Sequence, residues 1–284
     1  FFETTHEVYA KNLGEYFGKT IKGIFTDEPT LLPWHQDINW YIARGNGRVV
    51  PWNEKVYEIL NQRYGYNIDT IMAAVFYSDD SRMQDVRRNF WAVVGELYEK
   101  NFFKLYSEWC RSHGLVLTGH VLLEEGMYFN TIFQGNIIKN LEYFDMPGVD
   151  HLTKTAEENG LEFLVGNAPH IPKMKTNIQG QKLVVSAAHL SGNKKVLSES
   201  FGVSGWGLSI EDMKWIVNWQ YVLGINQLCP HAFFYSIEGF RKSDAPPCHM
   251  HNSNWKHYKI FADYVARLSH VLSRGVHRAH VALL

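Results

Sequence analysis

The sequence predicts an α/β protein with the architecture of a (β/α)8 TIM-type barrel, of which this chain holds strands four to eight. Five short apolar segments alternate with helical patterns, and strands that are joined through a helix pair in parallel. Each of these segments also ends on polar residues, and barrel enzymes keep their chemistry at the carboxyl ends of the strands. A doubly wound sheet would also accommodate five strands, and a complete but irregular barrel is the remaining alternative.

The expected strands share a run of apolar residues that stops at Pro, Gly or polar residues. They cover residues 21–26, 115–121, 146–152, 195–200 and 225–235. The strand at 115–121 is nearly all apolar, as expected when helices cover both faces of a parallel sheet.

The expected helices show apolar residues at the spacing of one helix face. They cover residues 3–17, 53–64, 68–76, 81–113, 130–144, 181–190, 210–223 and 255–272. The longest is amphipathic and ends before Gly114, a residue type that commonly closes helices. A connection rich in Trp, Pro and Gly at 30–52 and an irregular stretch at 160–176 lie between these elements.

The barrel segment is expected to occupy residues 1–275, as the C-terminal part of the whole barrel. Residues 276–284 read as a linker strand or the start of a following domain. Because the chain begins at Phe1 without an initiator Met and ends on an apolar run, we expect further domains of the same polypeptide. A cytoplasmic location is favoured, although the start of the chain carries no signal information.

The composition excludes several classes of function. The 284 residues are 45% hydrophobic with a formal net charge of −1, which is material for one large domain. Near-neutral charge without a basic run argues against a nucleic-acid partner. No stretch of 18 apolar residues occurs, so no membrane span is expected. The three cysteines are widely spaced and form no CxxC, which disfavours a disulfide framework or a zinc knuckle.

Two glutamates stand at predicted strand ends and are the candidates for catalysis. Glu28 ends the segment Gly-Ile-Phe-Thr-Asp-Glu-Pro, and Glu199 lies in Val-Leu-Ser-Glu-Ser-Phe-Gly, before a Gly-rich loop. Glycosidic-bond hydrolysis needs one acid to protonate the leaving oxygen and one base or nucleophile. We therefore expect Glu28 to act as the general acid and Glu199 as the base or nucleophile.

Further polar and aromatic residues at the strand exits are the candidates for substrate binding. The acids and histidines would bind or position hydroxyl groups, and the aromatic rings would stack on sugar faces. They are Asp27, Trp34, His120, Glu124, Asp150, His151, Trp206 and Tyr235. For Glu125 the ordinary role of an acid at a helix start is favoured, and His231 reads as an interior histidine.

Fourteen histidines raise the question of a metal. The densest group, Cys248-His249-Met250-His251 with His257, lies in a polar loop, and there is no HExxH or zinc spacing. No metal ligands are therefore predicted. A metal-dependent hydrolase that uses the histidines and a non-catalytic carbohydrate-binding barrel are the alternatives to a glycosidase.

These motifs resemble those of (β/α)8 glycoside hydrolases. Thr26-Asp27-Glu28-Pro29 is similar to the Asn-Glu-Pro signature of strand four in the large retaining clan, with Glu199 in the place of the strand-seven nucleophile. Asp27 stands where that clan has the Asn that binds the substrate 2-hydroxyl.

The whole series FTDEP, GHxxxEE, MPGVDH and SESFG looks more like the α-L-rhamnosidase type of multidomain bacterial enzymes. That resemblance implies an inverting, calcium-assisted enzyme whose partner is a glycoside, oligosaccharide or polysaccharide.

Overall fold

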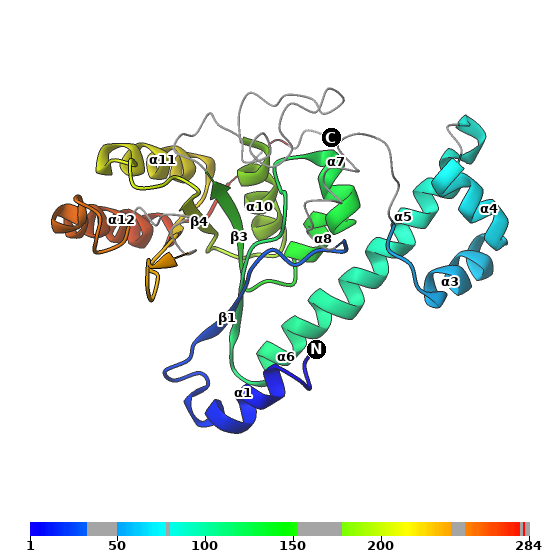
Figure 1. Cartoon of the computed structure of the whole chain (residues 1–284), viewed down its shortest axis with the longest axis horizontal. Coiled ribbons are helices and arrows are strands. Elements are labelled where there is room, and N and C mark those ends of the chain that lie inside the picture. The colour runs from blue at the N-terminus through cyan, green and yellow to red at the C-terminus, as the bar shows by residue number, and fades with distance from the viewer. Residues whose placement is uncertain (33–49, 78–79, 153–177, 240–247, 279–280, 282–284) are drawn as a thin grey trace.

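The chain forms a curled, parallel five-stranded half-barrel with helices packed around it (Figure 1). The computed structural model describes residues 1–32, 50–77, 80–152, 178–239, 248–278 and 281. Trp34, the irregular stretch at 160–176 and most of the expected terminal strand lie outside these ranges. The strands run in the order β1-β2-β3-β4-β5, which is also their chain order. They are β1 Gly23–Thr26, β2 Val116–Gly119, β3 Met146–Leu152, β4 Leu197–Gly202 and β5 Gln227–Pro230.

The helices alternate with the strands, as the sequence predicts. The α-helices are α1 His6–Leu13, α3 Glu54–Tyr64, α4 Ile68–Met72, α5 Gln84–Tyr98, α6 Leu105–Ser112, α7 Met127–Phe129, α8 Ile137–Leu141, α10 Ile178–Leu190, α11 Ile210–Leu223 and α12 Tyr258–Leu272. Short 3-10 or π segments are η1 Gly14–Tyr16, η2 Ala73–Tyr77, η3 Ser81–Met83, η4 Glu99–Lys104, η5 Asn130–Gln134 and η7 Trp255–His257. None of the described helices is both long and apolar enough to cross a bilayer.

Most elements begin and end within a few residues of the expected bounds, and two differ more. The helix expected at 130–144 is interrupted at Gly135, whose φ of 69° is left-handed and whose Cα faces the backbone of Gly95. The last strand is shorter than expected and stops at Pro230, which pairs with Ser200 near the end of β4. Closure into an eight-stranded barrel stays a prediction.

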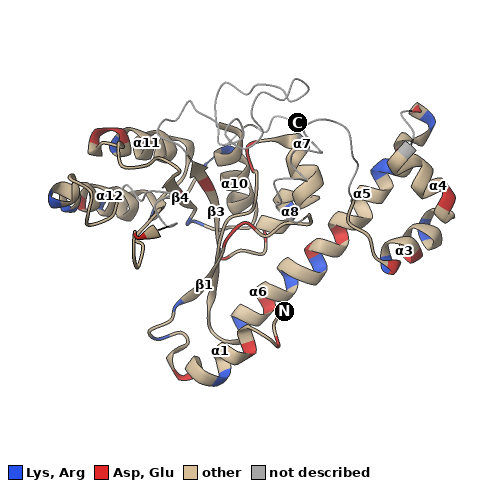
Figure 2. Ribbon diagram, viewed as in Figure 1, with Lys and Arg blue, Asp and Glu red and all other residues tan. Residues whose placement is uncertain are grey.

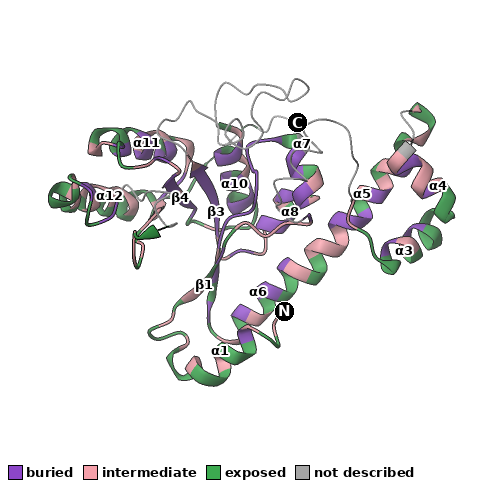
Figure 3. Cartoon of the chain, in the orientation of Figure 1, coloured by how far each residue is buried: buried purple, intermediate pink, exposed green. Residues whose placement is uncertain are grey.

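Two large apolar cores stabilise the described chain, and a third, smaller cluster includes Leu122 and Phe133. The larger lies between the sheet and its covering helices and includes the fully buried Leu117, Val149, Val184 and Ile216. Figure 3 shows β3 and the adjoining face of α10 as buried. The smaller core belongs to α3, α4 and α5, which form a helical lobe away from the sheet (Figure 1). Charged residues follow the exposed length of α5 and α6, the helix run that connects this lobe to the sheet (Figure 2).

The pairing register brings the carboxyl ends of the strands together. Thr26 pairs with Gly119, and Asp150 pairs with Glu199, which in turn pairs with Cys229. Gly119 has a φ of +126°, and a Cβ there would lie 2.0 Å from the carbonyl oxygen of Thr26. Only glycine permits this close approach of β2 to β1, and the next residue is the candidate site residue His120.

Candidate active site

Asp27 and Glu28 leave the end of β1 and differ in their surroundings. The Asp27 side chain is mostly exposed, whereas Glu28 is half-buried. Glu28 has a left-handed backbone with φ of 47°, which is uncommon for a residue other than glycine. Burial raises the pKa of Glu28, and the charges of Asp27 and Glu199 add to this against the opposing charge of His120. Glu28 is therefore suited to hold a proton.

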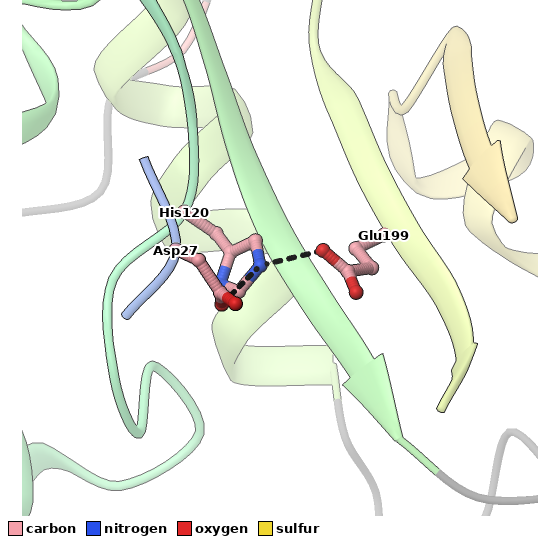
Figure 4. Close-up of side chains that lie close together, drawn as sticks. All are labelled: Asp27, His120 and Glu199. Carbon is pink, nitrogen blue, oxygen red and sulfur yellow. Dashed lines mark hydrogen bonds and ion pairs between the residues drawn. The ribbon is translucent and has the colours of Figure 1, made fainter. Parts of the chain in front are cut away.

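His120 is the centre of the site (Figure 4). It is fully buried, and its Nε2–H donates to Oε2 of Glu199 at 2.9 Å, with Oδ1 of Asp27 at 3.5 Å. Burial alone lowers the pKa of His120, but the hydrogen bond to Glu199 and the carboxyl groups of Asp150 and Glu124 raise it to about 10. At neutral pH His120 is thus an imidazolium, and its hydrogen bond to Glu199 is charge-assisted.

Asp150, Glu199 and Cys229 form a row across three neighbouring strands. Paired residues of parallel strands point to the same face of the sheet, and these three are paired in register. Asp150 is buried, and its Oδ1 has no hydrogen-bond partner among the described residues. Burial raises the pKa of the Asp150 carboxyl well above its usual range. Burial also raises the pKa of the Cys229 thiol, with the charges of Glu199 and Asp150 adding to the effect.

Glu124 and Glu125 form a second, deeper pair of acids in the turn after β2. Both side chains are buried, and the backbone N–H of Asp150 donates to Oε1 of Glu124 at 3.4 Å. Burial raises the pKa of Glu124 well above its usual range and that of Glu125 to about 7, where the charge of Glu28 contributes. The favoured interpretation of Glu125 as a helix-start acid missed this burial. The available signal was its position within the apolar run Val121–Met127.

Three of the expected substrate-binding residues lie apart from this cluster. His151 points to the helix-covered face, where Gln181 lies at 3.4 Å from its Nδ1 and the Trp219 ring at 5.4 Å between centroids. Trp206 lies in the loop after β4 and contacts His249, and the Tyr235 side chain is fully exposed after β5. The structure thus brings together Asp27, Glu28, His120, Glu124, Asp150 and Glu199, with Glu125 added.

A buried polar network lies behind Glu199, on the opposite face of β4. Ser198 and Ser200 flank Glu199, and their hydroxyls are 2.9 Å apart. The side-chain amide of Gln220 on α11 donates to both hydroxyls, at 3.0 and 3.1 Å. All three side chains are fully buried. The network fixes the pleat of β4 and with it the direction of the Glu199 side chain.

The ligand atoms of the oxygen-rich cluster match part of the calcium site that the resemblance implies. Asp27, His120 and Glu199, and separately Glu28, His120 and Asp150, each bring three potential ligand atoms within 4.8 Å of one another. Calcium takes about six to eight oxygen ligands, and each group offers two oxygens and a nitrogen. The unpartnered Oδ1 of Asp150 is the best-placed oxygen. The described residues therefore supply only part of a calcium site.

Known proteins similar to this chain include a sequence relative and a solved structure, and no protein-family model matches the sequence. A protein of Formosa agariphila named "Putative beta-glucuronidase" is 24% identical over 199 residues, which cover 68% of this chain and 15% of that protein. A rhamnosidase from Novosphingobium sp. PP1Y has a similar structure, with a TM-score of 0.57 and 17% sequence identity; the match covers 79% of this chain and 21% of the rhamnosidase. The chain thus spans about a fifth or less of the proteins it matches. The structural likeness supports the partial-barrel arrangement of the parallel sheet.

Proposed function

We propose that this chain carries the catalytic carboxyl groups of a glycoside hydrolase. The observation that carries the proposal is the pairing of two acids in different surroundings at the ends of β1 and β4. Burial favours the protonated form of Glu28, and Glu199 accepts a hydrogen bond from the buried His120. Two carboxyl groups in such different environments suit the separate roles of an acid and a base in one site.

In the proposed reaction, Glu28 donates its proton to the oxygen that leaves with the aglycone. Glu199 either removes a proton from an attacking water or attacks the anomeric carbon directly. His120 keeps one oxygen of Glu199 engaged and leaves the other available for this role. Asp27 and Asp150 bind hydroxyl groups of the sugar that is cleaved, and Glu124 positions Asp150 through its backbone N–H.

The two similar proteins support this class of reaction, because both carry the names of glycosidases. An α-L-rhamnosidase-like specificity is the finer proposal, based on the motif resemblance. A non-catalytic carbohydrate-binding barrel is the second candidate. It is the less favoured of the two, because sugar binding alone does not call for a buried imidazolium held against a carboxylate.

The test is hydrolysis of a panel of aryl glycosides by the full-length protein, including the α-L-rhamnoside, the β-D-glucuronide and the β-D-galactoside. Release of the aryl group from at least one of them supports the proposal. Proton NMR of the first product anomer then gives the stereochemical outcome. Retention would indicate carboxyl groups about 5–5.5 Å apart, and inversion about 6.5–9.5 Å. Binding of sugars without any hydrolysis would favour the second candidate.

A further inference from the structure

Besides Tyr235, three large aromatic side chains remain exposed at the end of the sheet that carries the candidate active site. Trp206 follows β4, Phe233 follows β5, and Trp255 begins η7; they are 38%, 53% and 39% exposed. β4 carries Glu199, and β5 pairs with β4 in parallel. Trp206 thus follows the strand that holds Glu199, and Phe233 follows the next strand of the sheet. Neighbouring strands lie about 4.8 Å apart.

The three rings belong to one cluster of aromatic contacts that includes His249. His249 is buried, and its ring lies 6.4 Å from Trp206 and 6.1 Å from Phe233 between centroids. Phe233 in turn meets Trp255 edge to face at 5.0 Å. Edge-to-face contacts of this kind stabilise aromatic clusters. We call Trp206, Phe233 and Trp255 the aromatic platform.

Polar contacts hold the backbone beneath the aromatic platform in place. The Nε2–H of His249 donates to the carbonyl oxygen of Phe234 at 3.2 Å, which ties the loop after β5 to the loop before α12. The side-chain amide of Asn252 donates to the carbonyl oxygen of Trp206 at 3.3 Å, which ties in the loop after β4. Three loops are thus fixed to one another before any ligand arrives, which lowers the ordering cost of binding.

The segments that carry the three rings are themselves uncharged, and the nearest charged residues at their ends are Glu238 and Lys256. Residues 203–208, 231–237 and 248–255 contain no Asp, Glu, Lys or Arg. They offer aromatic faces together with Ser, Asn and His side chains, which suit the C–H face and the hydroxyl groups of a neutral sugar. An anionic sugar such as a uronic acid would be expected to meet a cationic side chain, and these segments provide no Lys or Arg.

We propose that the aromatic platform is a binding subsite for a neutral pyranose ring of the substrate. The proposal rests on the glycoside hydrolase function above and deepens it by naming the class of sugar. It keeps Trp206 as a binding residue and adds Phe233 and Trp255, which are not among the binding residues expected from the sequence. Such a subsite would bind a ring of an oligosaccharide next to the sugar held by the carboxyl cluster.

The experiment uses the full-length protein with Glu199→Gln, so that ligands bind without turnover. Isothermal titration calorimetry is carried out with neutral gluco-, galacto- and rhamno-oligosaccharides and with an oligogalacturonide. The substitutions Trp206→Ala and Phe233→Ala are compared with Trp215→Ala, a control on α11 with a similarly exposed Trp. For the best neutral oligosaccharide, the dissociation constant is expected to rise at least about tenfold in the first two variants, equivalent to about 1.4 kcal/mol, and to stay constant in the control.

Two results would overturn the subsite. One is an unchanged dissociation constant in both platform variants; a lowered melting temperature in them would then show that the rings pack against protein instead. The other is tighter binding of the oligogalacturonide than of every neutral oligosaccharide.

Hydrolysis by the unsubstituted protein is measured in parallel. Platform-dependent binding without hydrolysis would refute the proposed function alone, and hydrolysis with platform-independent binding would refute the subsite alone.

Discussion

Replacing His120 by Asn should move the basic limb of the pH–rate profile upward by about 1–2 pH units. The basic limb reports the loss of the proton that Glu28 must hold as the general acid. His120 is a fully buried ring whose pKa is raised to about 10, and its charge lowers the pKa of Glu28 against the larger effect of burial. Asn can still donate a hydrogen bond to Glu199 but carries no charge. A neighbouring opposite charge shifts the pKa of a carboxyl group by about 1–3 units, so without the imidazolium Glu28 would keep its proton to a higher pH.

The assay is kcat/KM from about pH 4 to 9 with the aryl glycoside that is hydrolysed fastest, for the unsubstituted protein and for His120→Asn. His113→Asn is the matched control, because His113 is a partly buried histidine that stacks on Trp109, away from the carboxyl cluster. A folded His120→Asn protein with an unshifted basic limb would refute the role of the imidazolium. A uniform loss of rate at every pH would instead indicate a purely structural role.

The remaining predictions concern stability. Folding raises the pKa of His120 from 6.5 to about 10 and that of Glu125 from 4.5 to about 7. The bound protons therefore stabilise the folded state at low pH. As the pH rises, this stability is lost between 4.5 and about 7 for Glu125 and between 6.5 and about 10 for His120. Urea unfolding should accordingly give a free energy of unfolding that falls from pH 5 to pH 10, and a rise over this range would contradict the assignment. Gly119→Ala should destabilise by roughly 3 kcal/mol or more, since its Cβ would meet the β1 backbone, while Gly207→Ala, with open space around it, should change the melting temperature little. Gln220→Leu should cost about 1–3 kcal/mol because it leaves two buried serine hydroxyls without its amide; a melting temperature equal to that of the unsubstituted protein would show that the network is dispensable.

Much of the sheet could be predicted because its signals are local. The bounds of β3, Met146–Leu152, and of α11, Ile210–Leu223, agree with the expectations to the residue. α11 begins with a capping box between Ser209 and Asp212 and ends at Gly224 in a left-handed conformation, which are signals that a sequence displays directly. The order of parallel strands then follows from their alternation with helices.

The composition of the site was less predictable because it depends on side-chain direction and burial. Asp150 and His151 are adjacent in β3, so the alternation of a strand sends them to opposite faces, and only Asp150 reaches the cluster. Expecting both in the site overlooked this alternation. The burial of Glu125 depends on the path of the turn after β2, and the nearness of Trp206 to His249 depends on loops more than 40 residues apart along the chain. The apolar run Val121–Met127 is a local signal for the burial of Glu125, whereas the nearness of the two loops leaves no local pattern in the sequence.

The measurement that tests the central claim most directly is hydrolysis of the aryl glycoside panel by the full-length protein and its Glu28→Gln and Glu199→Gln variants. General acid or base catalysis contributes about 10²–10⁴-fold to rate. The account predicts hydrolysis of at least one glycoside by the unsubstituted protein and a fall in kcat of about this size in each folded variant. Near-normal kcat in either variant, or no hydrolysis of any glycoside by the unsubstituted protein, would contradict it.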